Sequence, residues 1–277
     1  MSNISIKLTS ESKGSNPGAK CDVEIFGIMS CFYLKYCPGS KLHKRSPYKS
    51  VHQPLYEALT FKLSEFLGLN IPDIYVIDNR NLNLNFENNI FKKKLSESLN
   101  YYFISKLVEN PFLSEEKEKK LDELVKYEST VSNLLLIDDV VGKRQNYGFY
   151  ADRPIYFDLG CSFVRATSGF LYQKNQKRYN VSSKELKQTL KKLDHYYVRN
   201  LNSNLLTKLS ELINHIPETQ IPLLDLKGHL KKEKISSLIS SSELDEIISS
   251  HIMNFFELSK KYCKNEKKDS NSLIFKK

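Results

Sequence analysis

The sequence predicts an α+β fold in which a small β-rich N-terminal part precedes a mostly helical C-terminal part. Short runs of β-branched and aromatic residues surround one helical pattern in the first third of the chain, and helical patterns dominate from about Asn88 onward. With 277 residues, of which 40% are hydrophobic, the chain is long enough for two lobes that each bury a core. We expect an N-terminal lobe over residues 1–88, a helical lobe over 89–263 and a basic, disordered tail over 264–277.

The N-terminal part is expected to contain a hairpin, one helix and two further strands. Val23–Phe26 and Cys31–Tyr36 are β-rich runs, and Gly27–Ser30 between them is expected to form the turn. Apolar residues at helical spacing predict a helix that stops at Gly68. The residues behind these expectations are Leu55, Leu59, Leu63, Phe66 and Leu67 for the helix, and Ile74–Ile77 and Leu82–Phe86 for the later strands.

The helical part is interrupted by one segment without helical periodicity, residues 138–163. Before it, a helix capped by Ser114 carries acidic residues in its first turn and is expected to end near Asp138. Inside the segment we expect two strands, Tyr147–Tyr150 and Pro154–Phe157. Three later helices are expected: one with the capping box Ser182–Glu185, one over Asn204–Ile213, and one from Ser241 or Ser242 to Tyr262.

Charge and cysteine usage limit the class of protein. The formal net charge of +10 favours phosphate-bearing partners such as nucleotides, nucleic acid or anionic lipid. Because the basic residues are spread along the chain, most are expected to be solvated, and a dedicated nucleic-acid site is not expected.

Five scattered cysteines without a CxxC pair indicate reduced thiols. No run approaches the roughly 20 apolar residues of a membrane span, and Met1–Ser12 lacks the apolar core of a secretion signal, so we expect a cytoplasmic protein.

Asn146 and Asp158 form the strongest candidate site in the sequence. They stand twelve positions apart, in Asn146-Tyr-Gly-Phe and Phe-Asp158-Leu-Gly, and the predicted hairpin between them would return both side chains to one place. A carboxylate and an amide carbonyl there could share a Mg²⁺ with nucleotide phosphates, because Mg²⁺ takes oxygen ligands and usually keeps some waters. The alternative is structural, with Asn146 in an Asx-turn and Asp158 as a cap.

Two further features could serve phosphate binding. The stretch Lys13–Lys20 contains Gly14, Ser15 and Gly18, and its backbone amides could close over phosphates, although such a stretch can equally be an ordinary turn. Lys35 lies on the second predicted strand and Glu57 lies early on the following helix. This pair could place a cation on the phosphates, or it could be an exposed surface pair.

Together these motifs, over roughly residues 13–163, resemble the HipA-like family of bacterial Ser/Thr protein kinases, and in particular its compact members of the cell-translocating kinase type. The resemblance implies a two-lobed protein-kinase-like fold that uses ATP and Mg²⁺. It assigns Lys13, Gly14, Ser15 and Gly18 to a phosphate loop, Lys35 to the nucleotide phosphates, Glu57 to Lys35, Asn146 and Asp158 to Mg²⁺, and Glu87 to the hinge that holds adenine.

One departure from the family pattern concerns the catalytic base. The family places its catalytic Asp five residues before the metal-binding Asn, where this chain has Val141, and Lys143 occupies the slot of a family histidine. Asp139 or its neighbour Asp138 could take the role of the base, and Lys143 could offset charge on the γ-phosphate. If neither aspartate does so, the chain is a pseudokinase, because loss of a positioned base costs on the order of 10² to 10⁴ in rate.

The resemblance therefore implies a kinase that phosphorylates a protein substrate, as a toxin with an antitoxin partner or as an effector delivered into another cell to act on a host protein. Two other classes of function remain open on the residues alone. One is a pseudokinase that binds nucleotide or a partner protein. The other is a binder of nucleic acid or phosphoinositide, whose affinity would fall steeply with salt.

Overall fold

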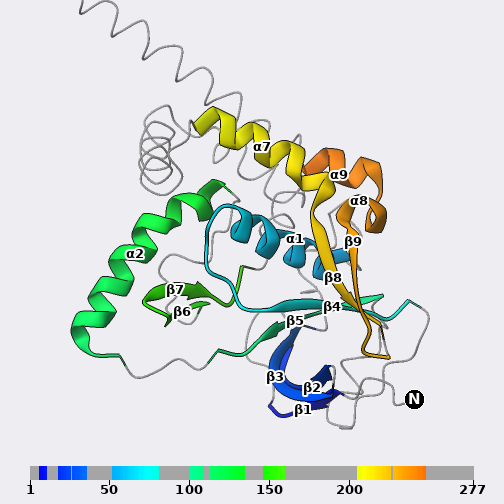
Figure 1. Ribbon diagram of the computed structural model, residues 1–277, viewed down its shortest axis with the longest axis horizontal. Coiled ribbons are helices and arrows are strands. Elements are labelled where there is room, and N and C mark those ends of the chain that lie inside the picture. Colours follow the sequence, from blue (N-terminus) through cyan, green and yellow to red (C-terminus); the bar gives the residue numbers. More distant parts are fainter. Residues whose placement is uncertain are drawn as a thin grey trace, which may run out of the picture.

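The protein is an α+β structure built on one mixed sheet of seven strands (Figure 1). The computed structural model describes residues 6–10, 18–25, 27–35, 52–80, 100–108, 113–134, 146–159, 205–225 and 227–247. In spatial order the strands are β1-β2-β3-β5-β4-β8-β9, and a separate two-stranded hairpin is formed by β6 (Tyr147–Tyr150) and β7 (Arg153–Tyr156). The strands of the large sheet are β1 (Ile6–Leu8), β2 (Gly18–Ile25), β3 (Ile28–Lys35), β4 (Ile74–Asp78), β5 (Tyr101–Lys106), β8 (Gln220–Leu224) and β9 (Leu230–Lys234).

The hairpin of β2 and β3 differs from its prediction at the turn. The strands pair from Gly18 opposite Lys35 to Ile25 opposite Ile28, so only two residues connect them. Gly27 has a φ of +74°, which suits the tight turns that connect antiparallel strands. Ile28 and Met29, expected in the turn, therefore belong to β3, where their side chains are exposed.

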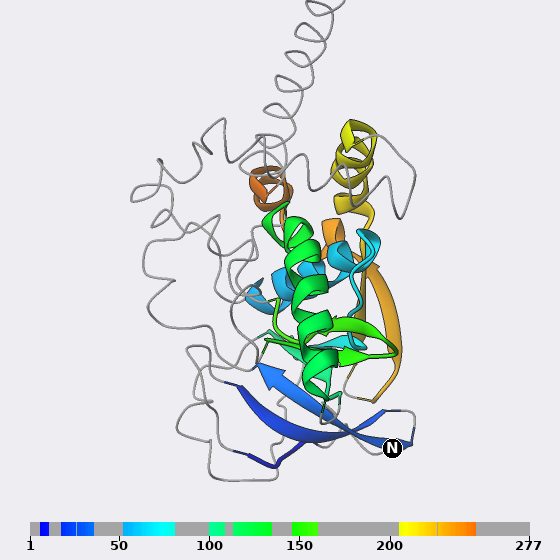
Figure 2. The same ribbon diagram turned by 90° about the vertical axis from the view of Figure 1, so that its left-hand side faces the viewer.

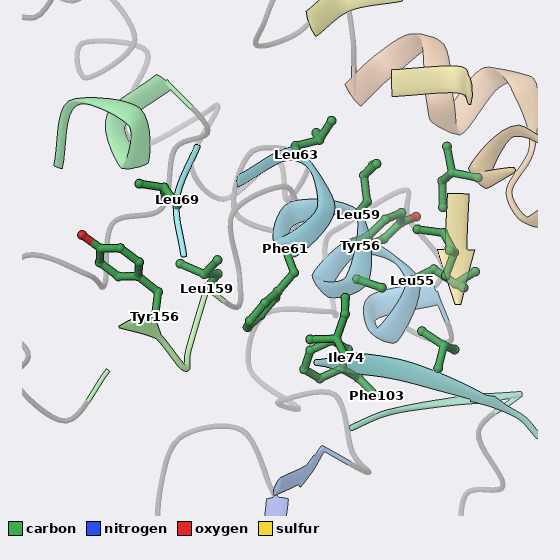
Figure 3. Packing of buried hydrophobic residues seen from close by; sticks show 14 of the residues in the cluster. Leu55, Tyr56, Leu59, Phe61, Leu63, Leu69, Ile74, Phe103, Tyr156 and Leu159 are labelled. Carbon is green, nitrogen blue, oxygen red and sulfur yellow. The ribbon is translucent and has the colours of Figure 1, made fainter. Parts of the chain in front are cut away.

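Helix α1 (Gln53–Phe66) is confirmed and packs against β4, β5 and β8 on one face of the sheet (Figures 1 and 3). It ends as predicted at Gly68, whose φ is +91°. The N–H of Gly68 donates to the carbonyl of Glu65 and the N–H of Leu69 donates to the carbonyl of Ser64, both at 2.9 Å. These two bonds form a Schellman motif, which satisfies the last carbonyls of the helix.

Buried side chains form clusters on both faces of the sheet. Residues that alternate along a strand point to opposite faces, and so Val76 and Phe103 lie in the cluster with α1, whereas Ile77, Tyr102 and Ile104 lie in the cluster with β1–β3. The α1 cluster also includes residues of α2, the β6–β7 hairpin and the C-terminal helices. In Figures 1 and 2, β1–β3 lie at the opposite end of the molecule from α7.

Three strands that were not predicted lie in the part of the chain expected to be mostly helical. β5, β8 and β9 all follow Asn88 and join the same sheet as the N-terminal strands, so the sheet includes chain on both sides of the predicted boundary at residue 88. β5 is a run of aromatic and β-branched residues buried on both faces, a pattern that a central strand shares with a buried helix. β8 pairs in parallel with β4, with Val76 opposite Leu223, across a separation in sequence that no local pattern could reveal.

The described helices of the C-terminal part largely follow the predictions. α2 (Glu115–Leu134) begins after Ser114, whose Oγ accepts the N–H of Lys117 at 3.4 Å. α7 (Leu205–Glu218) continues beyond its predicted end at Ile213. It is followed, after β8 and β9, by α8 (Ile235–Leu238) and α9 (Ser241–Ile247). The predicted strand Leu82–Phe86, the helix at Ser182–Glu185 and the tail from residue 264 lie outside the described residues. Over the described ranges, none of the helices combines the length and hydropathy needed to cross a membrane.

Candidate functional site

Lys35 is the centre of a cluster that joins three distant parts of the chain. It is the last residue of β3, and its Nζ lies 2.8 Å from Oδ1 of Asp158 and 3.1 Å from Oε2 of Glu57. Glu57 belongs to α1 and Asp158 follows β7. The structure thus brings together three of the side chains singled out in the sequence.

The register of the sheet turns Lys35 toward α1. Lys35 pairs with Phe103 of the neighbouring strand β5, and its Nζ lies 5.9 Å from the centroid of the Phe103 ring. Phe103 faces α1 in the core, so the lysine stem packs on apolar surface while its ammonium group reaches the carboxylates. Only 10% of the Lys35 side chain is exposed, which excludes the alternative of a surface pair.

Glu57 is a buried carboxylate that depends on Lys35 for its charge. Its side chain is 2% exposed, and Gln53, one turn earlier on α1, donates from Nε2 to Oε1 at 3.4 Å. Burial raises the pKa of Glu57 above its ordinary value, and the Lys35 ammonium opposes this rise. Oε2 of Glu57 lies 3.1 Å from Lys35 Nζ, so the two side chains form a buried ion pair.

Asp158 differs from Glu57 in its access to solvent. Its side chain is 48% exposed, although it contacts the same ammonium. One positive charge between two negative charges leaves the cluster with a net charge of −1. The excess negative charge lies next to the exposed carboxylate, where a cation from solvent could reach it.

Asn146 lies next to Asp158 through the backbone of the β6–β7 hairpin, formed by β6 (Tyr147–Tyr150) and β7 (Arg153–Tyr156). The carbonyl of Asn146 accepts the N–H of Phe157 at 2.8 Å and that of Asp158 at 3.4 Å. The turn residues Ala151 and Asp152 both have positive φ, as a type I′ hairpin turn requires. The hairpin therefore returns the chain to its starting point, as the spacing of twelve residues predicted.

Three side chains that the sequence analysis did not single out hold this hairpin in place. The Tyr156 hydroxyl donates to Oε2 of Glu128 on α2 at 2.6 Å, and the Tyr147 hydroxyl donates to Oδ1 of Asp122 on the same helix at 3.1 Å. Arg153 Nη2 donates to the carbonyl of Gly68 at 2.8 Å, just past the end of α1. The tyrosines alternate with other residues along the two short strands, and that alternation is the one local signal that could have indicated them.

The anchor residue Glu128 is itself largely buried. Burial raises its pKa above the ordinary value, while the Tyr156 hydrogen bond and Arg153, whose Nη2 lies 4.0 Å from Oε1, act in the opposite direction.

Gly18 lies in strand β2 and not in the turn where it was expected. It stands opposite Lys35, and a Cβ at this position would lie 2.7 Å from the carbonyl oxygen of Leu34. The glycine is therefore required by close packing of β2 on β3. Gly18, the one predicted phosphate-loop residue that the structure describes, thus lies opposite Lys35 at the start of β2.

The remaining predicted site residues are not placed by the structure. Lys13, Gly14, Ser15, Glu87, Asp139 and Lys143 all lie outside the described residues, as does Val141. Within the described ranges, no three His, Cys, Asp or Glu side chains gather in a way that could hold a metal ion. A cation at Asp158 would therefore need further oxygen ligands, from Asn146, a bound phosphate or water.

Comparison with known proteins does not identify a family for this chain. The sequence matches no protein-family model and none of the curated proteins. What can be said about function therefore depends on the cluster of Lys35, Glu57 and Asp158 and on the elements that hold it.

Proposed function

We propose that the chain is an ATP- and Mg²⁺-dependent protein kinase of the HipA-like type, with a two-lobed kinase-like fold, which transfers the γ-phosphoryl group to a Ser or Thr hydroxyl of a protein. The observation that carries the proposal is the Lys35 ammonium, held between a buried glutamate on a helix and a half-exposed aspartate after a hairpin.

The order and placement of these residues support the proposal. Protein kinases carry a phosphate-binding lysine on the third strand, pair it with a glutamate on the following helix, and hold Mg²⁺ with an aspartate and an asparagine. Here Lys35 ends the third strand and Glu57 lies on the first helix, while Asn146 and Asp158 stand at the two ends of one hairpin. A buried ion pair of this kind fixes the direction of the ammonium group before a ligand binds.

The donor atoms present fit a magnesium–nucleotide complex. Asp158 offers an exposed carboxylate in a cluster of net charge −1, and the backbone of Asn146, whose side chain carries an amide oxygen, is hydrogen-bonded to the backbone of Asp158. These two residues would hold Mg²⁺, which supplies charge neutralisation on the phosphates. Lys35 would remain with Glu57 and turn its other donors to phosphate oxygens. The predicted loop, Lys13–Lys20, would cover the phosphates beside the start of β2.

Catalysis would come from positioning and charge stabilisation of the transferring group. We assign the orientation of the substrate hydroxyl to Asp139, with Asp138 as the other candidate, and a contact with the γ-phosphate to Lys143.

The sequence favours one alternative, because Val141 occupies the position of the family's catalytic aspartate. In that alternative the chain is a pseudokinase that binds nucleotide or a partner protein without efficient transfer. The proposed setting is cytoplasmic, in the chain's own cell or in one into which it is delivered as an effector.

Two measurements on the full chain test this function. The first is thermal stabilisation by ATP with Mg²⁺, and the second is incorporation of label from γ-labelled ATP into protein. We expect stabilisation and transfer in the wild type, loss of both in Lys35→Met and Asp158→Ala, and loss of transfer alone in Asp139→Ala. Asp73→Asn is the matched control, because Asp73 is an exposed carboxylate that pairs with Lys106 at 3.6 Å, away from the cluster.

The outcomes separate the alternatives. Stabilisation without transfer in the wild type selects the pseudokinase. If Mg²⁺ and ATP leave the melting temperature of the wild type unchanged, nucleotide binding at Lys35 is excluded and the kinase proposal fails with it.

A further inference from the structure

A second carboxylate, Glu243, connects the C-terminal helix α9 to the helix that carries Glu57. It lies at the start of α9 in a capping box with Ser240: the N–H of Glu243 donates to Ser240 Oγ at 3.3 Å, and the N–H of Ser240 donates to Glu243 Oε2 at 3.3 Å. The Ser240 hydroxyl also donates to Oε2 at 3.1 Å. One carboxylate oxygen is therefore committed to the cap of its own helix.

The other oxygen of Glu243 reaches across to α1. Oε1 lies 2.7 Å from Nδ1 of His52, the residue before the helix, and it also accepts the hydroxyl hydrogen of Tyr56. The residues in these two contacts are 191 and 187 positions apart in sequence. The His52 ring in turn lies against two tyrosines, with its centroid 6.3 Å from that of Tyr101 on β5 and 6.4 Å from that of Tyr56.

The start of helix α1 lacks two of its usual stabilising features, although Pro54 in its first turn favours helix initiation. Its N-cap residue, His52, makes no side-chain hydrogen bond that caps the helix, and the first turn contains no acidic residue. A carboxylate near a helix N-terminus interacts favourably with the helix dipole. Glu243 supplies that negative charge from a different element, and it contacts Tyr56, which directly precedes Glu57.

Burial and packing show that the contact belongs to the interior. Glu243 is a buried residue, and the neighbouring Ile235, Leu238, Ile239 and Leu244 lie in the same cluster as α1. Burial alone would raise the pKa of Glu243, but the hydrogen bonds from Tyr56 and His52 hold that pKa below its ordinary value. The carboxylate is thus stabilised in its charged form by the side chains of α1 that it holds.

We propose that Glu243 is a positioning residue for the candidate site: by holding His52 and Tyr56 it sets the first turns of α1 and keeps Glu57 directed at Lys35. The segment 235–247 then regulates the site from within the chain, because any event that displaces α9 loosens the pair of Glu57 and Lys35. Only the part of this inference that concerns nucleotide affinity rests on the proposed kinase function.

The first test needs no nucleotide. Urea unfolding of wild type, Glu243→Ala, Lys35→Met and the double variant forms a thermodynamic cycle. Glu243→Ala should raise the unfolding equilibrium constant in both backgrounds. We expect the rise to be about five or more times larger in the wild type than in Lys35→Met, because without Lys35 there is no ion pair left to position. Equal factors in the two backgrounds would overturn the proposal.

Three variants separate positioning from general loss of stability. Glu243→Gln keeps the capping box and an acceptor for Tyr56, so its effect on stability should be small and nearly equal in the wild-type and Lys35→Met backgrounds. Tyr56→Phe removes one hydroxyl and provides a milder version should Glu243→Ala fail to fold. Asp245→Ala, an exposed residue of the same helix, is the matched control and should show no coupling to Lys35. Coupling as large in Asp245→Ala as in Glu243→Ala would contradict the proposal.

The second test uses Mg²⁺ and ATP with the full chain. Glu243→Ala should raise the Kd of ATP about tenfold, in the range of typical coupling between sites, with recovery in Glu243→Gln and no effect in a Glu57→Gln background. An equal rise in both backgrounds would overturn the positioning role. If the wild type binds no ATP, the proposed function fails, while the cycle without nucleotide still decides whether Glu243 positions Glu57.

Discussion

The two carboxylates that contact Lys35 are chemically alike, yet their surroundings are opposite. Glu57 is 2% exposed and Asp158 is 48% exposed, although both lie within ion-pair distance of the same Nζ. A buried carboxylate without a partner is costly, whereas an exposed one is solvated by water. From this difference we predict that Glu57 stays paired with Lys35, whereas Asp158 is open to a ligand from solvent.

The elements that carry the two residues differ in the same way. Glu57 lies on a helix packed between the large sheet and the C-terminal helices, so its position is set from several sides. Asp158 follows a two-stranded hairpin that is held by hydrogen bonds from Tyr147, Tyr156 and Arg153. One side of the cluster is thus part of the core, and the other is an attached surface element.

The largest effect is expected when the shared cation is removed. Lys35→Met leaves Glu57 buried without its partner and should lower the free energy of unfolding by about 3 kcal/mol or more. Urea unfolding measures this directly. The control Lys106→Met removes an exposed lysine from β5 and should change stability by less than about 0.5 kcal/mol. Similar losses in both variants would show that Lys35 is not a buried ion-pair partner.

Neutralising each of the two carboxylates in turn should have different effects on stability. Glu57→Gln removes a buried charge partner and should cost about 2 kcal/mol, whereas Asp158→Asn, at an exposed site, should cost less than about 1 kcal/mol. Stability is again read from urea unfolding. In contrast, Asp158→Asn should abolish any stabilisation by ATP and Mg²⁺. Equal stability losses would break the distinction between a permanent and an exchangeable partner.

A smaller effect is expected at the anchor of the hairpin. Tyr156→Phe leaves Glu128 Oε2 without the Tyr156 hydroxyl as its donor and should lower the free energy of unfolding by about 1 to 2 kcal/mol. Tyr150→Phe on the same hairpin is the control, because Tyr150 is exposed and should tolerate the change. Chemical unfolding of both variants provides the measurement. If Tyr156→Phe leaves stability unchanged, the hydrogen bond from Tyr156 to Glu128 does not stabilise the hairpin.

The smallest effect concerns the pH dependence of stability. Burial raises the pKa of Glu128 in the folded state above its ordinary value of 4.5, so the folded protein binds this proton more tightly than the unfolded chain. Its contribution is therefore fully present below that value and is lost as the pH rises through the folded-state pKa.

The free energy of unfolding should be measured from below pH 4.5 to above the folded-state pKa of Glu128. It should fall less steeply with pH in Glu128→Gln than in the wild type. The pKa of Glu57 is raised as well, but Glu57 is present in both proteins. The difference between the wild-type and Glu128→Gln profiles therefore reports on Glu128 alone. Parallel profiles would contradict the assignment.

Local elements were predictable because their signals lie within a few residues of one another. The helical spacing of apolar residues and the terminating Gly68 identified α1, and the cap Ser114 identified the start of α2. The β6–β7 hairpin followed from two short strands around a turn. In contrast, the turn between β2 and β3 was placed too late, because the exposed Ile28 and Met29 do not show the alternating burial expected of a strand.

The candidate site was predictable only in part. The order of Lys35 and Glu57 and the spacing of Asn146 and Asp158 identified residues that the structure brings together or holds adjacent in the backbone. Gly18 was assigned to a turn although it is a strand residue. Glu243 and Tyr156 were missed because their partners, Tyr56 and Glu128, are distant in sequence, and no local pattern shows which distant residue each contacts.

By itself, the sequence determined the local elements, the cationic character of the chain and the residues that we propose to bind phosphate and a divalent ion. Only the tertiary structure decided that β5, β8 and β9 complete the sheet, that Glu57 is buried while Asp158 is open, and that Glu243 holds α1. The physical reason is that periodicity, caps and turns act between near neighbours, whereas strand pairing, burial and the charge state of a carboxylate depend on which distant segments pack around it.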